Sequence, residues 1–283
     1  MTHKILVTGA TGTIGQALIN QLQTKNADFV AGVRNIDEAK KKLPSVNNFV
    51  EFDFSNSATY EGAVENVDRV FVLGPPMEMH LDELVAPFLD FLKSKEINRV
   101  VYLSALGSEY MKTLTFHTTL TQKIKDDGFD FTILKPSFFA QNFKNYEGEN
   151  ITERGVVYVP AGDGKAAFVD VNDIAAVAAT ALTEDGHVGK TYEITGPEAL
   201  SYQDAAKLLS EVTGKQIVYP VPTPEEFTAT LKQAGAPDFI APYMIDVYSM
   251  ISNHHVNVVS NHVEQVTGNK PTALKSVLEQ QFS

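Results

Sequence analysis

The chain has 283 residues, of which 43% are hydrophobic, so it carries enough apolar material to fold around a substantial core. With 23 Lys and Arg against 35 Asp and Glu, the formal net charge is -12, which argues against nucleic acid or an anionic membrane surface as a partner. The absence of cysteine excludes disulfides, thiolate metal sites and a cysteine nucleophile. Without a signal-peptide pattern or an apolar run of the roughly 20 residues that a membrane span needs, we expect a cytoplasmic protein.

Short apolar runs alternate with longer segments of helical period in the first half of the chain. The runs predict strands at Lys4–Thr8, Asp28–Val33, Asn48–Phe52, Arg69–Leu73, Arg99–Leu103 and Phe129–Leu134. The periodic segments predict helices at Thr13–Lys25, Asp37–Leu43, Ser57–Glu65, Leu81–Lys95 and Thr115–Asp126. Strands that alternate with helices form a parallel sheet covered on both faces, with right-handed crossovers. We therefore predict an α/β protein with a Rossmann-type doubly wound parallel sheet.

The pattern changes after about residue 142. We expect short strands at Phe168–Asp170 and Lys190–Thr195, with a turn over residues 160–165. Further helices are expected at Val171–Thr183, Ser201–Thr213, Pro224–Ala234, Pro237–Ser252, Asn257–Thr267 and Pro271–Gln281. The sequence thus predicts a nucleotide-binding core of residues 1–145, to which residues 166–196 return. Residues 146–165 and 197–283 are expected to form a smaller, mostly helical C-terminal domain on the substrate side.

A glycine-rich turn follows the first strand and opens the first helix. Gly9 permits a tight turn, Gly12 lets a pyrophosphate approach the backbone, and Gly15 lets helix and strand pack closely. Free amides and the positive end of the helix dipole meet there, so Thr11, Thr13 and Ile14 are also expected beside a bound dinucleotide. The alternative is a tight strand-helix turn without a ligand.

Residues that follow the second and third strands bear on which dinucleotide binds. Arg34 stands where NAD-binding sites usually carry a carboxylate for the ribose, and it suits a 2′-phosphate. This favours NADP(H), with NAD(H) still possible, although Arg34 can equally be a solvated surface residue. Asp53 can hold an adenine amino group, or cap the turn that follows it.

The next strand ends supply the remaining candidates. Leu73, Gly74, Pro75 and Pro76 form a stiff loop suited to run beside the ribose and nicotinamide, or simply a rigid turn. Ser104 can donate a hydrogen bond to a substrate carbonyl or oxyanion, which makes it a candidate catalytic residue, or it can serve in a local turn.

After the sixth strand, aromatic and amide side chains could form a wall for a flat ring. Pro136 and Phe138 are assigned to the cofactor side of this wall, and Phe138, Phe139 and Asn142 to a substrate pocket. The alternative is a loop that lines the core.

These motifs together resemble NmrA-like proteins, atypical members of the short-chain dehydrogenase/reductase superfamily. The resemblance is carried by residues 9–15, 33–35, 132–139, 162–165, 168–175 and 192–197, and by the diproline loop. The segment from His117 to Lys123 resembles a helix start of the NADPH:quinone oxidoreductase branch. The resemblance implies bound NADP(H) and hydride transfer to a quinone or similar flat electrophile. It also implies an alternative, a non-catalytic NADP(H)-binding redox sensor that regulates a protein partner.

One departure from the superfamily bears on the chemistry. Ordinary members use Tyr-x3-Lys on the helix after the fifth strand, where the lysine lowers the pKa of the tyrosine. We place Thr113 and His117 at these two positions, so the usual proton relay for alcohols and ketones is missing. Quinone reduction depends less on such a proton relay. His117 is therefore the second candidate catalytic residue, and it is expected beside the nicotinamide ribose. The alternative is a polar residue at a helix start.

Other chemistries have weaker support. The remaining histidines show no metal-ligand spacing with carboxylates, so no metal is expected. No Gly-x-Ser-x-Gly motif indicates a hydrolase. A phenolic reductase or isomerase is less favoured because the family lysine is missing. A homodimer is possible.

Overall fold

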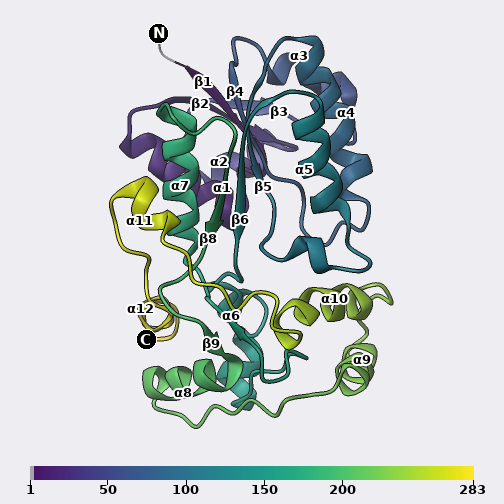
Figure 1. Ribbon diagram of the computed structural model, residues 1–283, viewed down its shortest axis with the longest axis vertical. Helices are drawn as coiled ribbons and strands as arrows, with labels where there is room; N and C mark the ends of the chain where they lie inside the picture. The colour runs from purple at the N-terminus through teal and green to yellow at the C-terminus, as the bar shows by residue number, and fades with distance from the viewer. Residues whose placement is uncertain (1–2) are drawn as a thin grey trace. The chain divides into compact units, whose positions relative to one another are not determined.

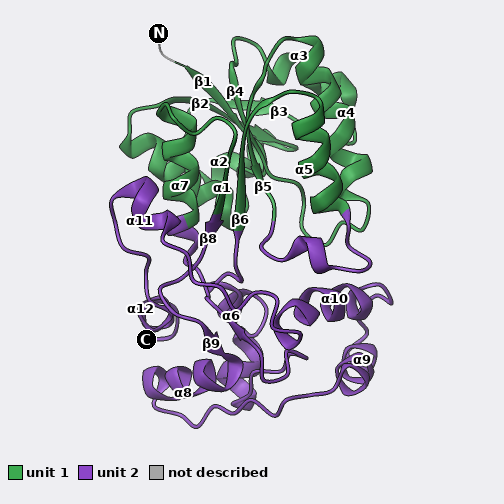
Figure 2. Ribbon diagram, viewed as in Figure 1, with its two compact units in different colours: residues 1–104, 116–135, 174–192 green, residues 105–115, 136–173, 193–283 purple. Residues whose placement is uncertain are grey.

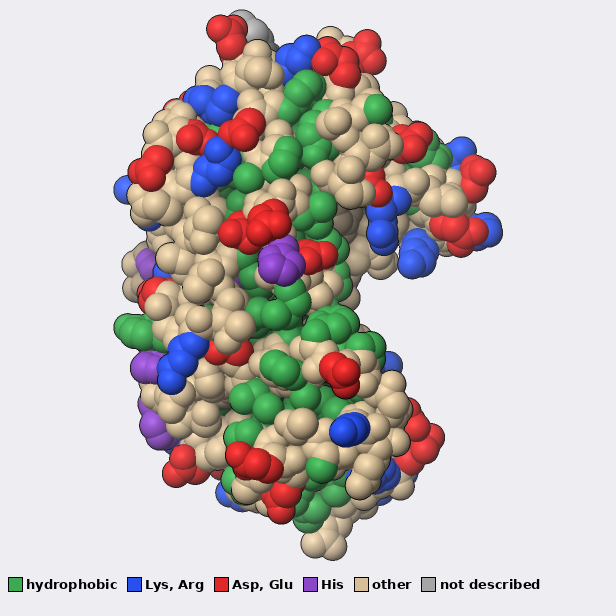
Figure 3. Space-filling view, turned by 90° about the vertical axis from the view of Figure 1, so that its right-hand side faces the viewer, with side chains coloured by type: hydrophobic (Ala, Val, Ile, Leu, Met, Phe, Trp, Pro, Cys, Tyr) green, Lys and Arg blue, Asp and Glu red, His purple; other side chains and the backbone are tan. Residues whose placement is uncertain are grey.

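The computed structural model describes residues 3–283, and the chain divides into two units. Unit 1 comprises residues 1–104, 116–135 and 174–192, and unit 2 comprises residues 105–115, 136–173 and 193–283 (Figure 2). Acidic, basic and apolar side chains are interspersed over the face drawn in Figure 3.

Unit 1 is built on a sheet with the strand order β3-β2-β1-β4-β5-β6-β8. The strands are β1 (Lys4–Val7), β2 (Asp28–Val33), β3 (Phe49–Glu51), β4 (Arg69–Val72), β5 (Arg99–Leu103), β6 (Asp130–Pro136) and β8 (Lys190–Ile194). The first six pair in parallel, and Ile5 of β1 lies between Phe29 of β2 and Arg69 of β4. The order reverses between β1 and β4, and ligands of open α/β sheets bind at the carboxyl ends of strands at such a point.

Helices cover both faces of this sheet. They are α1 (Thr13–Thr24), α2 (Ile36–Lys42), α3 (Tyr60–Ala63), α4 (Leu81–Ser94), α5 (Phe116–Asp126) and α7 (Val171–Thr183). Figure 1 shows α1, α2 and α7 on one face, and α3, α4 and α5 on the other. Because both faces are covered, strands such as β4 carry a continuous apolar run, and Val70, Phe71 and Val72 are fully buried. The predicted Rossmann-type fold is confirmed.

Unit 2 has its own core. Its elements are η2 (Ser108–Tyr110), α6 (Asn142–Asn145), η3 (Asn150–Arg154), β7 (Lys165–Ala166), β9 (Leu200–Ser201), α8 (Tyr202–Thr213), α9 (Pro224–Gln233), α10 (Ile240–Ser252), α11 (His262–Thr267) and α12 (Leu274–Phe282). The rings of Phe143, Phe168 and Tyr202 pack together at centroid distances of 5.2–5.5 Å. A capping box between Ser201 and Asp204 starts α8 at Tyr202, one residue after the predicted start.

Some predicted elements were wrong in extent. The strand expected at Phe168–Asp170 is a single bridge between Val169 and Phe139, and the short strand β7 instead begins at the last residue of the predicted turn. The helix expected over Ser57–Glu65 is divided into the 3-10 turn η1 (Ser57–Thr59) and the short α3. Across the described residues, no helix is long and apolar enough to cross a membrane.

Three C-terminal helices start later than their sequence pattern suggests. The first is α10, which was expected from Pro237 and begins at Ile240. In the other two, tertiary hydrogen bonds hold the preceding residues extended. The backbone N–H of Ser260 donates to the hydroxyl of Thr195 at 3.0 Å, and α11 begins only at His262. The backbone N–H of Thr272 donates to the carboxylate of Asp173 at 2.7 Å, and α12 begins at Leu274.

Candidate cofactor and active site

The glycine loop joins β1 to α1 in a conformation that excludes side chains at two of its three glycines. Gly9 has φ +63°, in the left-handed region that favours glycine. A β-carbon at Gly15 would lie 2.2 Å from the carbonyl oxygen of Gly9, so even alanine would collide with backbone. The backbone N–H of Gly12 donates to that same carbonyl at 3.0 Å, which closes the turn.

The start of α1 is suited to an anion. Within residues 3–283, no side chain caps this helix and no acidic residue lies in its first turn. Its first amides therefore have no side-chain acceptor, and the positive end of the helix dipole is not neutralised. Gly9, Gly12 and Thr13 are exposed, while Ile14 and Gly15 are buried and anchor the helix. The pyrophosphate of a dinucleotide fits this cradle of glycines and amides.

Thr8, which the sequence analysis missed, connects the glycine loop to the diproline loop. Its buried hydroxyl accepts a hydrogen bond from the backbone N–H of Leu73 at 2.8 Å. The same hydroxyl lies 3.0 Å from the carbonyl of Phe71 and 3.1 Å from that of Leu73. The Leu73 side chain in turn lies 3.0 Å from where a β-carbon of Gly9 would stand. Leu73 and Gly74 are thus brought beside the glycine loop, followed by the exposed Pro75 and Pro76.

Arg34 and Asp53 follow β2 and β3 at the same edge of the sheet. Arg34 is exposed. The carboxylate of Asp53 accepts hydrogen bonds from the backbone N–H of Ser55 at 2.9 Å and from its hydroxyl at 2.8 Å. The backbone bond is the main cause of a lowered pKa for Asp53, against the raising effect of partial burial, and the charge of Arg34 adds to the lowering. Asp53 therefore caps the turn that follows it, which is one of the two roles expected from the sequence. The other role, a contact to adenine, stays a prediction.

Ser104 directly follows β5 and is buried, with 4% of its surface exposed. Its Oγ has no hydrogen-bond partner among the described residues. Buried hydroxyls normally have a partner, so Ser104 is an exception in this sheet, and its role toward a substrate stays a prediction.

His117, in the first turn of α5, is hydrogen-bonded to a strand residue that is not among the candidates predicted from the sequence. Its Nδ1 lies 2.7 Å from the hydroxyl of Tyr102 in β5. Burial lowers the pKa of His117 to about 4 and raises that of Tyr102. No sequence motif links a tyrosine within a strand to a histidine on the following helix. The sequence pattern of β5 alone therefore could not reveal this pair.

Lys123, which lies near the family position in the sequence, is engaged elsewhere. Lys123 Nζ pairs with the carboxylates of Asp90 at 2.5 Å and Asp127 at 2.9 Å, and these carboxylates raise its pKa. Thr113 is held through its backbone, whose N–H donates to the carboxylate of Asp246 at 2.9 Å. Neither residue reproduces the tyrosine-lysine pair of ordinary superfamily members.

The four remaining candidates lie in unit 2. Pro136 is buried, and Phe138 is half-buried against Tyr248, with ring centroids 5.9 Å apart. Phe139 is fixed by its bridge to Val169, and Asn142 begins α6. The loop is therefore rigidly anchored within its own unit, and its role in a substrate pocket stays a prediction.

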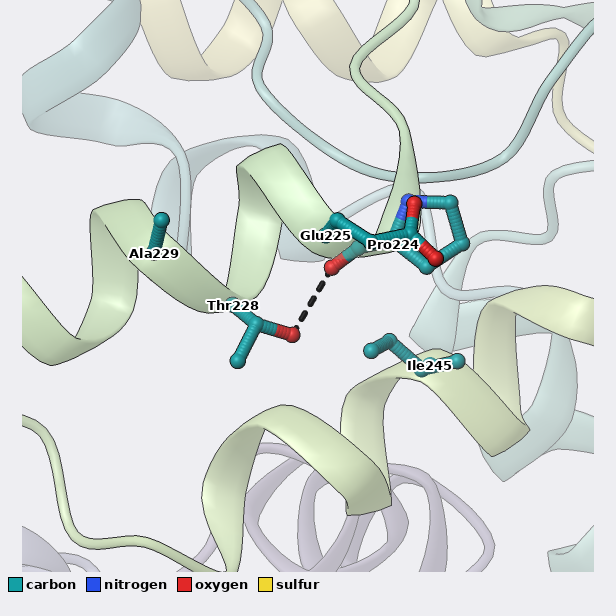
Figure 4. A pocket seen from close by; sticks show the side chains of 5 residues that line it. All are labelled: Pro224, Glu225, Thr228, Ala229 and Ile245. Carbon is teal, nitrogen blue, oxygen red and sulfur yellow. Dashed lines mark hydrogen bonds between the residues drawn. The ribbon is translucent and has the colours of Figure 1, made fainter.

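A shallow hollow lies between α9 and α10, and none of the candidate site residues lines it. Pro224, Glu225, Thr228, Ala229 and Ile245 line it, and the hydroxyl of Thr228 bonds back to the carbonyl of Pro224 at 2.7 Å (Figure 4). No cluster of three His, Asp or Glu side chains in the described part of the chain could hold a metal ion.

The fold and the glycine cradle define a Rossmann-type protein with a dinucleotide-type anion site. Residues 1–281 match the NmrA-like family, and the chain belongs to that family, as its motifs predicted. An NAD(P)H azoreductase of Xenophilus azovorans is 31% identical over 267 residues, which cover 93% of both chains.

Two solved structures are also similar over almost their whole length. An NADPH-dependent quinone oxidoreductase of Escherichia coli, complexed with NADPH, is 26% identical with a TM-score of 0.89, covering 99% of this chain and 100% of that one. A triphenylmethane reductase of a Citrobacter species, complexed with NADP(H), is 26% identical with a TM-score of 0.86, covering 98% of this chain and 99% of that one. The expected likeness to NADPH quinone oxidoreductases is confirmed.

Proposed function

We propose that this protein transfers hydride from NADPH to a quinone or a similar flat electrophile. At the coarser level, it is an NAD(P)H-dependent oxidoreductase that uses NADP(H), like the azo, quinone and dye reductases to which it is similar. The observation that carries the proposal is the glycine cradle at the uncapped start of α1, which matches a pyrophosphate in charge and space. The assignment of a quinone as the substrate rests on the absence of the tyrosine-lysine pair that alcohol and ketone chemistry uses.

The proposal assigns a role to each part of the site. Gly9, Gly12 and Gly15, with Thr11, Thr13 and Ile14, hold the pyrophosphate, and Arg34 contacts the 2′-phosphate. Asp53 lies by the adenine, and residues 73–76 lie along the ribose and nicotinamide. Pro136 and Phe138 belong to the cofactor wall, and Phe138, Phe139 and Asn142 to the substrate pocket. Residues 1–145 and 166–196 form the cofactor domain, and 146–165 and 197–283 the substrate domain.

In this mechanism the protein orients the reactants and supplies hydrogen bonds. Bound NADPH provides the hydride. Ser104 and His117 donate hydrogen bonds to an oxygen of the cofactor ribose or of the substrate. Hydride addition to a quinone leaves an aromatic phenolate, which is a far weaker base than an alkoxide. It therefore needs no ionisable tyrosine, and correct placement of the two rings supplies most of the rate enhancement.

Turnover tests this proposal directly. The purified protein is mixed with NADPH and a panel of quinones, azo compounds and triphenylmethane dyes, and the loss of absorbance at the reduced-nicotinamide band is followed. Saturable turnover with quinones is the expected result. Turnover confined to azo compounds or dyes would overturn the quinone assignment. Tight NADPH binding without turnover on any acceptor would instead support the redox sensor, whose partner would be a protein.

A further inference from the structure

The contact between Tyr102 and His117 sets which nitrogen of the histidine carries the proton. Tyr102 is completely buried in β5, and its hydroxyl lies 2.7 Å from His117 Nδ1. Among the residues that the structure describes, neither the Tyr102 side chain nor the His117 side chain has another hydrogen-bond partner. The pair joins the middle of the sheet to the first turn of α5 within unit 1.

The direction of this hydrogen bond follows from the acceptors within reach. A buried tyrosine hydroxyl needs an acceptor for its proton, and Nδ1 is the acceptor that the fold provides. If Nδ1 carried the proton and donated it, the Tyr102 O–H would be left buried without a partner. Tyr102 therefore donates, Nδ1 accepts, and the proton of the neutral imidazole resides on Nε2.

The surroundings keep both groups uncharged. Burial lowers the pKa of His117 and raises that of Tyr102, and the negative charge of Asp82 in α4 adds to the latter shift. The ring of Phe116 packs edge-on against the imidazole at a centroid distance of 4.7 Å. A hydrogen bond accepted by the neutral ring further disfavours protonation of His117.

We propose that Tyr102 is a positioning residue, which holds His117 as the Nε2–H tautomer so that Nε2 serves as a fixed hydrogen-bond donor. This inference rests on the proposed function, which places His117 beside the cofactor ribose or the substrate. Because Nε2–H donates and cannot accept, it selects an acceptor such as a carbonyl oxygen or an oxyanion. A donor fixed in this way partly replaces the tyrosine hydroxyl of ordinary superfamily members without needing to ionise.

Nitrogen NMR of the imidazoles tests the tautomer without any cofactor. The chain has seven histidines, and the His117 signals are identified as those that disappear in His117→Gln. In ¹⁵N-labelled wild type, long-range ¹H–¹⁵N correlations should show a protonated Nε2 and a bare Nδ1 at neutral pH. Tyr102→Phe should give a mixture of the two tautomers.

Tyr60→Phe is a matched control, because it also removes a buried tyrosine hydroxyl, which bonds to the Phe54 carbonyl. It should leave the His117 signals unchanged. A protonated Nδ1 in the wild type, or an unchanged tautomer in Tyr102→Phe, would overturn the inference. The wild-type spectrum decides the matter even if Tyr102→Phe does not fold.

Kinetics separates the inference from the proposed function. Tyr102→Phe should lower kcat for quinone reduction about tenfold with little change in KM. His117→Gln, whose amide nitrogen can still donate, should retain several times more activity than His117→Leu. Equal losses in these two variants would contradict the donor role. If NMR shows the expected tautomer but no quinone is reduced, the proposed function is contradicted. The assignment of the Tyr102–His117 hydrogen bond is then still supported.

Discussion

Gly15 lies so close to Gly9 that a β-carbon on the former would stand 2.2 Å from the carbonyl oxygen of the latter. That carbonyl also accepts the N–H of Gly12, so it cannot move without opening the turn. The start of α1 and the end of β1 are thereby held in contact, and this contact shapes the cradle.

Replacing Gly15 by alanine should therefore damage cofactor binding. The methyl group pushes α1 away from the loop, at a cost of about 1–3 kcal/mol for an overpacked site. We expect NADPH affinity to fall by at least tenfold in isothermal titration calorimetry. Gly62→Ala is the control, because a β-carbon there has no neighbour within 4 Å. NADPH binding by Gly15→Ala at wild-type affinity would refute the proposed site.

Arg34→Ala tests the preference for the phosphorylated cofactor. A charge-assisted hydrogen bond contributes about 1.5–3 kcal/mol, so the dissociation constant for NADPH should rise roughly 10- to 100-fold while that for NADH changes little. Lys42→Ala removes another exposed positive charge and controls for the general electrostatic effect. Equal losses for the two cofactors in Arg34→Ala would exclude a contact to the 2′-phosphate.

The buried carboxylate of Asp246 holds the segment that leads into α5. It accepts the backbone N–H groups of Lys112, Thr113 and Leu114 at 3.2, 2.9 and 2.9 Å. Asp246→Ala leaves these donors without an acceptor, and we expect the free energy of unfolding to fall by about 2–4 kcal/mol. Asp246→Asn keeps one acceptor oxygen and should lose less.

Chemical denaturation measures both variants, and Asp238→Ala, at an exposed position, serves as the control. A change below about 0.5 kcal/mol in Asp246→Ala, which is typical of surface substitutions, would show that the segment does not depend on this carboxylate.

His117 should make folding stability depend on pH. Its pKa is lowered from 6.5 to about 4 in the folded state, so the unfolded chain binds a proton as the pH falls through 6.5 while the folded chain does not. Stability is therefore lost between about pH 6.5 and pH 4, by at most about 3 kcal/mol, with no further loss from this group at lower pH.

His117→Gln removes this titration. Unfolding free energies at pH 7.5 and pH 4.5 should differ less in His117→Gln than in the wild type, when each is measured by urea denaturation. The same pH dependence in both proteins would mean that the imidazole keeps an ordinary pKa in the folded state.

Local features of the sequence were enough to place most of unit 1. β2, β5 and α7 occupy the predicted residues, because an uninterrupted apolar run or a strong helical period needs no partner to be recognised. The glycine loop was predictable for the same reason, since its spacing and its neighbours in the chain specify the turn. Comparison with known proteins confirmed the family that these motifs indicated.

Contacts between distant residues were beyond the reach of such patterns. Nothing near Tyr102 in the sequence indicates His117 as its partner, and nothing near Asp246 indicates a loop more than 130 residues earlier. The late starts of α11 and α12 have the same cause, since Thr195 and Asp173 supply the bonds that hold the preceding segments. The sequence by itself determined the fold class and the nucleotide-type loop, which depend on short-range backbone preferences. Only the tertiary structure decided which side chains meet and which protons they carry, because those depend on the packing of separate elements.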